Sequence, residues 1–356
     1  MEKFNYEWRI KDSIFTKDKG TVFSCFAGGG GSTMGYKLAG FDVIGCCEID
    51  PRMNAIYVAN HNPKINLLMD IRDVVAKAKL HDLPKELYQL DILDGSPPCS
   101  SFSIVGEREK GWGKEKKFRE GQTKQVLDTL FFDFIELAKY LQPKVVVAEN
   151  VKGLMVGEAK KYVSKIYDEF EKAGYYCQHF LLDASKMGCP QKRERVFFLS
   201  LRKNLADKFL INRGLFEVCP YVDMTFNCKP IAFCNVKDGK GRLLPPKITE
   251  IWKKRKFGDI YLMNAYYREF QKQKYFSQHY VYDDEVCKTL TTHEDSLVLY
   301  DEPRYTSKSE AIKISTFPLD YNFLKEKPHY VLGMSVPPLM MANVAKNIYE
   351  QWLSKL

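Results

Sequence analysis

Short apolar runs recur over the first two hundred residues or so, and polar or glycine-rich turns separate them from segments with helical spacing. Runs of this kind, bounded by Gly, Pro and polar clusters, are typical of buried strands in a parallel sheet. They predict strands at 21–26, 42–47, 65–69, 88–93, 144–148, 176–182 and 196–201. Helical spacing predicts helices from the glycine turn to about residue 38, at 126–141 and around 159–172. This alternation favours an α/β fold with a mostly parallel, doubly wound sheet.

The regular alternation stops after Leu201. From there to about residue 300 the chain mixes aromatic residues, lysines and irregular turns, which indicates a smaller, separate domain. Residues 339–353 again carry an apolar stripe at helical spacing, and such a stripe has to be buried against another element. We therefore predict a first domain over residues 1–201, a smaller domain over 202–300, and a return segment over 301–356 whose helix completes the first domain.

A glycine-rich turn follows the first predicted strand, and an acidic residue, Glu48, follows the second. The order of strand, glycine turn, helix, strand and acid is that of a nucleotide-binding βαβ unit. The turn does not match the dinucleotide-binding motif Gly-x-Gly-x-x-Gly, because Thr33 or Met34 stands at the position of the last glycine. Glu48 lies 20 residues after Gly28, where a carboxylate can accept hydrogen bonds from ribose hydroxyls. The pattern favours an adenosine ligand without a pyrophosphate; a plain glycine-rich connector is the alternative.

A second turn, in the stretch from Asp91 to Ser103, presents a cysteine. The apolar run ends in Gly-Ser-Pro-Pro, and the two prolines stiffen the backbone that leads into Cys99. A thiol on a rigid turn at a strand end is suited to act as a nucleophile. A small buried hydrophobe is the alternative reading of a free cysteine. The stretch alone leaves both open.

Charge and cysteine content narrow the class of protein. The formal net charge is +9, and basic residues gather at 108–124 and 253–256, which is compatible with a nucleic acid partner or with a solvated face. The ten cysteines form no Cys-x-x-Cys and there are six histidines, so we expect no metal site. No apolar run is long enough to cross a membrane, and residues 1–7 lack a signal-peptide pattern, so we expect a cytoplasmic protein.

Five motifs occur along the chain: Phe26-Ala27-Gly28-x-Gly30-Gly31 with Glu48, Pro97-Pro98-Cys99-x-x-Phe102-Ser103, Glu149-Asn150-Val151, Gln191-x-Arg193-x-Arg195 and Gly333-x-Ser335-Val336-Pro337-Pro338. They resemble the motifs of the DNA (cytosine-5)-methyltransferase family of bacterial or phage restriction-modification systems, in the family's order and at comparable spacing. The resemblance covers roughly residues 20–355. Residues 304–323 also resemble the stretch that precedes the family's last motif.

The resemblance implies a class I fold that uses S-adenosyl-L-methionine and releases S-adenosyl-L-homocysteine. Residues 1–201 would bind the cofactor and catalyse the reaction, and residues 202–300 would recognise the target. Glu48 would hold the ribose and Asp70 would lie near the adenine amine. The full set of cofactor residues that the resemblance implies is Phe26, Ala27, Gly28, Gly30, Gly31, Glu48, Ile49, Asp70, Ile71, Pro98, Leu130 and Ser335.

The resemblance also implies a mechanism of site-specific DNA methylation. A target cytosine would be flipped out of the duplex, and the Cys99 thiolate would add to C6 so that C5 can accept the methyl group. Glu149 would bind the N3 and N4 edge of the base, and Arg195 would bind O2 with support from Arg193. The glycine-containing segment 100–123 would close over the site. The base that removes the C5 proton is not evident from the residues.

Two positions depart from the family pattern: Ser100 stands where Gln is usual, and Met334 replaces the usual Asn. We expect a monomer that acts on double-stranded DNA and not on a membrane, and a cognate restriction endonuclease would act separately. A transfer-RNA cytosine-5 methyltransferase and a catalytically degenerate DNA-binding homologue are the alternatives.

Overall fold

The computed structural model describes residues 4–98, 129–156, 159–212, 218–271 and 278–356. The chain forms two compact units that are interleaved along the sequence. The larger unit comprises residues 15–182, 194–225 and 341–356, and the smaller unit comprises residues 1–14, 183–193 and 226–340. The compact units therefore follow other boundaries than the predicted functional division at residues 201 and 300, which stays a prediction.

The larger unit is built on a seven-stranded sheet of order β3-β2-β1-β4-β5-β7-β6. The pairings from β3 through β5 are parallel, and β7 runs antiparallel to β5. The predicted doubly wound α/β fold is confirmed. The strands are β1 (Thr21–Cys25), β2 (Asp42–Glu48), β3 (Ile65–Leu68), β4 (Ile92–Gly95), β5 (Val145–Val151), β6 (Tyr175–Asp183) and β7 (Glu194–Arg202).

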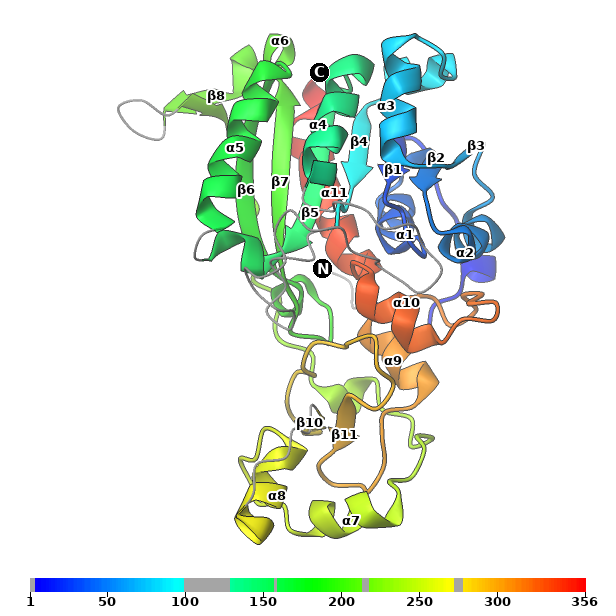
Figure 1. The fold of residues 1–356 in the computed structure, drawn as a ribbon, viewed down its shortest axis with the longest axis vertical. Helices are drawn as coiled ribbons and strands as arrows, with labels where there is room; N and C mark the ends of the chain where they lie inside the picture. Colours follow the sequence, from blue (N-terminus) through cyan, green and yellow to red (C-terminus); the bar gives the residue numbers. More distant parts are fainter. Residues whose placement is uncertain (1–3, 99–128, 157–158, 213–217, 272–277) are drawn as a thin grey trace. The chain divides into compact units, whose positions relative to one another are not determined.

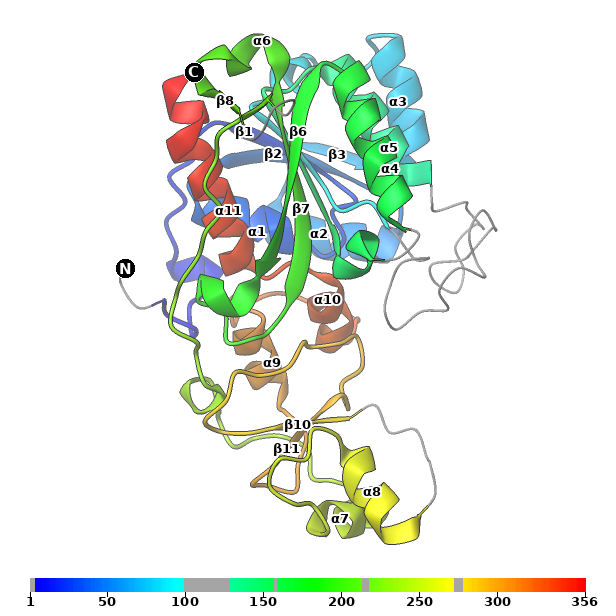
Figure 2. The same ribbon diagram turned by 90° about the vertical axis from the view of Figure 1, so that its left-hand side faces the viewer.

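Helices cover both faces of this sheet, as Figures 1 and 2 show. One apolar core lies between the sheet and the helices α3 (Ile71–Lys79), α4 (Leu130–Leu141) and α5 (Ala159–Lys172). Figure 2 shows α1 (Gly31–Leu38) and α11 (Pro338–Gln351) on the opposite face. The unit also contains α2 (Pro51–His61), α6 (Lys203–Ala206), and the short antiparallel pair β8 (Leu210–Asn212) and β9 (Val218–Pro220). The helix predicted at 339–353 is thus present as α11, and the buried Trp352 that follows it donates to the carbonyl of Tyr221 at 2.7 Å.

The strand boundary that differs most from the prediction is the start of β4. Residues 88–93 were expected to be a strand, but Lys85–Gln89 form a 3₁₀ helix and β4 begins only at Ile92. Leu87 and Leu90 are buried in the main core from this turn, so their apolar character reflects packing beside the sheet and not within it. The N-terminal part of the helix predicted at 126–141 lies outside the described residues.

The smaller unit has little regular structure. It contains α7 (Pro246–Lys253), α8 (Leu262–Phe270), α9 (Lys308–Ile314), α10 (Pro328–Met334) and the paired strands β10 (His279–Val281) and β11 (Leu297–Leu299). A small core that includes Trp252, Leu262 and Tyr280 lies among them. In the part of the chain that the structure describes, no helix is long and apolar enough to cross a membrane.

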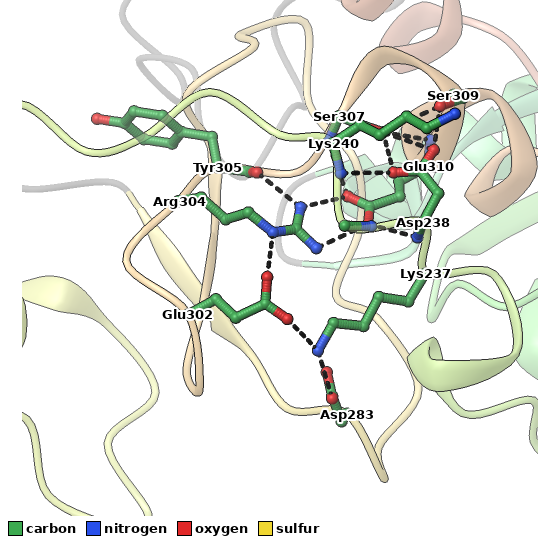
Figure 3. Close-up of polar contacts among 11 residues, drawn as sticks. Lys237, Asp238, Lys240, Asp283, Glu302, Arg304, Tyr305, Ser307, Ser309 and Glu310 are labelled. Carbon is green, nitrogen blue, oxygen red and sulfur yellow. Dashed lines mark hydrogen bonds and ion pairs between the residues drawn. The ribbon is translucent and has the colours of Figure 1, made fainter.

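A buried ionic network ties distant segments of the smaller unit together (Figure 3). The Arg304 guanidinium donates through two nitrogens to the two carboxylate oxygens of Glu310, both at 2.9 Å, and these side chains are 4% and 0% exposed. Glu310 also accepts the backbone N–H groups of Ser307 and Asp238, at 2.7 and 2.9 Å. Lys237 bridges Asp283 and Glu302, each at 2.6 Å. Because charged groups this deep need full compensation, the network fixes loop 237–240 against the start of α9.

Candidate functional site

The sheet places the ends of three strands side by side. The register pairs Cys25 of β1 with Gly95 of β4, and Gly95 with Ala148 of β5. The residues that follow these strands therefore emerge at one edge of the sheet: the glycine turn after β1, the Ser-Pro-Pro turn after β4, and Glu149 near the end of β5. The carboxyl edge of an open parallel sheet is where ligands bind in such folds.

The glycine turn has a conformation that suits close approach to its backbone. Phe26, Gly28 and Gly30 have positive φ angles of 51°, 50° and 87°. A Cβ built on Gly28 would meet no described atom within 4 Å, so its position is not filled by neighbouring protein. The absence of a side chain at Gly28 is therefore not explained by local packing, and it leaves room beside the backbone.

Glu48, at the end of β2, is bonded to this turn. Its Oε2 accepts the Gly28 N–H at 2.7 Å, and its Oε1 accepts the N–H groups of Ile49 and Asp50 at 2.9 and 2.8 Å. Burial raises the pKa of Glu48, although the three backbone donors act in the opposite direction. A carboxylate has about four acceptor positions, so these contacts leave one on Oε2, beside the open position at Gly28. This arrangement fits a ligand that brings a hydroxyl donor, such as a ribose.

The other predicted cofactor residues of the larger unit have diverse surroundings. Asp70 caps α3, accepting the Arg72 N–H at 2.9 Å, and the hydrogen-bonded Arg72 guanidinium, 2.6 Å away, lowers the pKa of Asp70. Ile71 and Leu130 are buried in the main core, and Phe26 packs edge-on against Phe134 at 6.4 Å between ring centroids. Their cofactor contacts remain predictions.

The Ser-Pro-Pro turn is held by Asn150. Its side-chain Nδ2 donates to the carbonyl oxygen of Pro97 at 3.1 Å in a buried setting. Gly95 is needed where the turn begins, because a Cβ there would lie 2.6 Å from the Phe134 ring. Cys99 and the segment 100–123 lie outside the described residues, so their predicted roles stay predictions. Asn150 was not predicted as a site residue, although its place in the Glu-Asn-Val motif was the available signal.

Glu149 and Arg195 form an ion pair across β5 and β7. The register pairs Glu149 with Phe197 and Val151 with Arg195, so the two side chains are diagonal neighbours on one face. Arg195 Nε lies 2.9 Å from Glu149 Oε1, and Arg195 Nη1 donates to the Glu194 carbonyl at 2.8 Å. Burial lowers the pKa of Arg195 while Glu149 acts in the opposite direction, and an arginine stays protonated. Nη2 is the guanidinium nitrogen that neither contact uses.

Arg193 has a different environment. It is buried in the smaller unit, where its guanidinium donates to the carbonyls of Leu290 at 3.3 Å and Gly333 at 2.9 Å. A Cβ on Gly333 would lie 2.4 Å from the backbone of Thr291, so only glycine fits there. These contacts hold Arg193 within its own unit. The predicted support of Arg195 by Arg193 stays a prediction.

Two other motif residues, Gln191 and Ser335, also form hydrogen bonds within the smaller unit. Gln191 accepts the Leu290 N–H at 3.1 Å and donates to the Ile314 carbonyl at 3.3 Å. Ser335 follows α10, and its hydroxyl donates to the Val331 carbonyl at 2.7 Å. Its predicted contact with the cofactor stays a prediction.

One buried acid at the sheet edge was missed from the sequence. Asp94, in β4, accepts the Ser24 hydroxyl at 2.8 Å and the Tyr36 hydroxyl at 3.2 Å. Burial raises its pKa to about 7. A polar residue inside an otherwise apolar run was the signal for a buried, hydrogen-bonded role.

A seven-stranded sheet of this order in which β7 runs antiparallel to β5, with a glycine turn after β1 and an acid at the end of β2, is typical of the class I methyltransferase fold. Residues 20–350 match the family described as C-5 cytosine-specific DNA methylase, and the chain belongs to that family. The predicted family resemblance is confirmed.

Relatives of the chain include type II methyltransferases of bacteria and an orphan methyltransferase of a phage. The type II methyltransferase M.FnuDI of Fusobacterium nucleatum is 35% identical over 52% of this chain and 47% of its own length. M1.HphI of Haemophilus parahaemolyticus is 25% identical over 93% of this chain and 87% of its own length. The orphan methyltransferase M.Rho11sI of Bacillus phage rho11s is 31% identical over 55% of this chain and 36% of its own length. The chain spans about half the length of two of these curated relatives, M.FnuDI and M.NgoPII of Neisseria gonorrhoeae.

Solved structures share the fold at low sequence identity. A prophage-encoded candidate DNA modification methyltransferase (E. coli) has a TM-score of 0.66 and 20% identity, covering 93% of this chain and 99% of that one. A mutant of DNMT2 from Spodoptera frugiperda has a TM-score of 0.65 and 17% identity over the same shares.

Proposed function

We propose that this protein transfers a methyl group from S-adenosyl-L-methionine to C5 of a cytosine in duplex DNA. The observation that carries the proposal is the Glu149–Arg195 pair at the end of β5, beside the turn that leads from β4 to Cys99, in a chain of the C-5 cytosine-specific DNA methylase family. The net charge of +9 agrees with a polyanionic substrate.

The cofactor would lie along the glycine turn. Glu48 Oε2 would accept a ribose hydroxyl, and the open position at Gly28 would admit the ligand close to the backbone. S-adenosyl-L-methionine, when bound, supplies an electrophilic methyl group on a sulfonium. The protein's part is to hold the adenosine so that this methyl group faces the base.

The base would be held by Glu149 and Arg195. Glu149 would bind the N3 and N4 edge of the extruded cytosine, and Arg195 would offer Nη2, which its present contacts leave over, to O2. The Cys99 thiolate would add to C6, which makes C5 nucleophilic so that it can take the methyl group. Loss of the C5 proton to water and expulsion of the thiolate from C6 would then restore the ring and the free enzyme. Asn150 would set the direction of the turn that carries Cys99 through its bond to Pro97.

A labelled-methyl assay tests the proposal. The protein is incubated with tritiated cofactor and either duplex DNA or transfer RNA, and the methylated DNA is mapped by bisulfite sequencing. Labelled 5-methylcytosine at a defined DNA sequence is expected. The Cys99→Ser variant should bind DNA but transfer no methyl group, and normal turnover by it would refute the nucleophile.

Two outcomes would replace the proposal. Transfer to transfer RNA alone would make the protein an RNA methyltransferase. DNA binding without any covalent adduct on duplexes that carry 5-fluorocytosine would make it a binding protein that has lost catalysis.

A further inference from the structure

Phe257 is a large apolar side chain that the fold leaves in water. It is 87% exposed, and its only ring contact among the described residues is edge-on with Tyr282, at 5.9 Å between centroids. Burying a side chain of this size is worth about 2 kcal/mol, so an exposed one contributes little to folding. A single exposed apolar residue needs no explanation by itself, and the case depends on the turn that presents it.

The turn that carries Phe257 is tightly fixed. The Asp259 carboxylate accepts the Lys256 N–H at 2.9 Å and both terminal nitrogens of Arg268 at 2.6 Å. The Tyr282 hydroxyl accepts the Gly258 N–H at 3.2 Å and donates to the Asp259 carbonyl at 2.9 Å. Gly258 has a φ of +88°, which favours glycine. Hydrogen bonds of Asp259 and Tyr282 therefore fix the turn, while the Phe257 side chain that the turn carries has little packing of its own.

The charge around the turn indicates what it meets. Phe257 follows four consecutive basic residues, Lys253 to Lys256, and the three lysines are exposed. Arg255 is stacked on Trp252, 3.3 Å from the ring centroid, and donates to the Tyr300 carbonyl at 2.5 Å, so it serves the fold. Lys253 and Lys254 pair with Glu250 and Glu269, at 2.8 and 3.2 Å. Lys256 forms no ion pair with a described residue, and it directly precedes the rigidly presented aromatic ring. Lysine contacts to phosphate with an apolar side chain wedged against bases is a known mode of DNA binding.

We infer that Phe257 makes apolar contact with the bases of duplex DNA while Lys256 contacts a neighbouring phosphate. The inference rests on the proposed function for the identity of the polyanion. It assigns to one side chain a contact that is independent of the methyl-transfer chemistry.

Binding to a fluorescent DNA duplex tests the inference with the full-length protein. Phe257→Ala should weaken binding about tenfold, the loss expected for one aromatic contact with a base. The slope of log Kd against log salt concentration should stay as in the wild type. Lys256→Ala should instead make the slope shallower by about 0.9, the value for one phosphate contact. Leu80→Ala is the matched control: Leu80 is 79% exposed beside Lys79 in the larger unit, and its loss should leave DNA binding unchanged.

A photo-crosslink makes the contact direct. With p-benzoylphenylalanine at position 257, irradiation should link the protein to DNA, and the same group at position 80 should not. Crosslinks only between protein chains, or wild-type affinity of Phe257→Ala, would overturn the inference. Methyl transfer by the wild type with unaltered DNA binding of Phe257→Ala would refute this contact alone. Weakened binding by Phe257→Ala in a protein that never methylates DNA would refute only the proposed activity.

Discussion

Most of the acceptor positions of the Glu48 carboxylate are occupied by backbone N–H groups of the chain. Three N–H donors, from Gly28, Ile49 and Asp50, converge on one carboxylate. Its role is thus double: it shapes the glycine turn, and it keeps one acceptor position beside it. A residue with such a double role cannot be removed without affecting both the turn and the ligand.

Glu48→Ala should weaken cofactor binding by about tenfold or more, because a buried charged acceptor is lost and three donors are left without it. Isothermal titration with S-adenosyl-L-methionine measures the change. Glu86→Gln, on an exposed ion pair with Lys64, is the control and should bind normally. An unchanged cofactor affinity of Glu48→Ala would refute the ribose contact.

Asp94 should make the free energy of unfolding depend on pH, in a direction that its raised pKa determines. Its pKa is raised from 3.8 to about 7, so between these values the unfolded state releases its proton and the folded state keeps it. The free energy of unfolding of the wild type should therefore fall, from this group, as pH rises from about 4 to about 7. Asp94→Asn should lack this component, so its stability relative to the wild type should rise over the same range. Urea titrations at pH 4.5 and 7.5 compare the two proteins, and a constant difference would contradict the prediction.

Among the secondary-structure elements, the strands were predicted best from the sequence. Residues 145–148 of β5 are fully buried and form an unbroken apolar run, and β1 departs from such a run only at Thr21 and Ser24. The continuation of β5 through Glu149 and Asn150 was not evident from the apolar pattern. The start of β4 was misplaced because Leu87 and Leu90 are equally apolar but pack from a 3₁₀ turn. Periodicity reports burial, and it does not say which kind of element achieves it.

Contacts between segments that are distant in the sequence could not be predicted from the apolar pattern. The two carbonyls that hold Arg193 lie 97 and 140 residues away in sequence. Gln191 and Arg193 belong to one motif and Gly333 to another, and only the fold shows that Arg193 donates to Gly333 and that Gln191 and Arg193 both bond to Leu290. The Glu149–Arg195 pair required the register of β5 and β7.

The ionic network around α9 permits a stability prediction. Glu310→Gln should lower the free energy of unfolding by about 3 kcal/mol, because it leaves the buried Arg304 short of its counter-charge. Chemical denaturation of the purified protein measures the loss. Glu294→Gln, which removes an exposed ion pair with Lys327, should cost less than about 1 kcal/mol. Equal effects of the two substitutions would show that the buried network is not important for stability.

At the scale of the whole molecule, charge makes one further prediction. A chain of net charge +9 that contacts DNA phosphates releases counterions on binding. If it neutralises six or more phosphates, its affinity for duplex DNA should fall by about a thousandfold or more between 50 and 200 mM salt. Fluorescence anisotropy measures this, and cofactor affinity over the same range should change little. A DNA affinity independent of salt would refute a binding mode through phosphates.

The interleaving of the two compact units has a consequence for biosynthesis. The sheet of the larger unit is complete once Arg202 is made, but the residues from Met341 onward, including the buried Trp352, arrive about 140 residues later. During translation, the face that α11 covers therefore stays bare while the ribosome adds the entire intervening segment. Nascent chains of this protein should accordingly be clients of ribosome-associated chaperones until α11 has emerged from the exit tunnel.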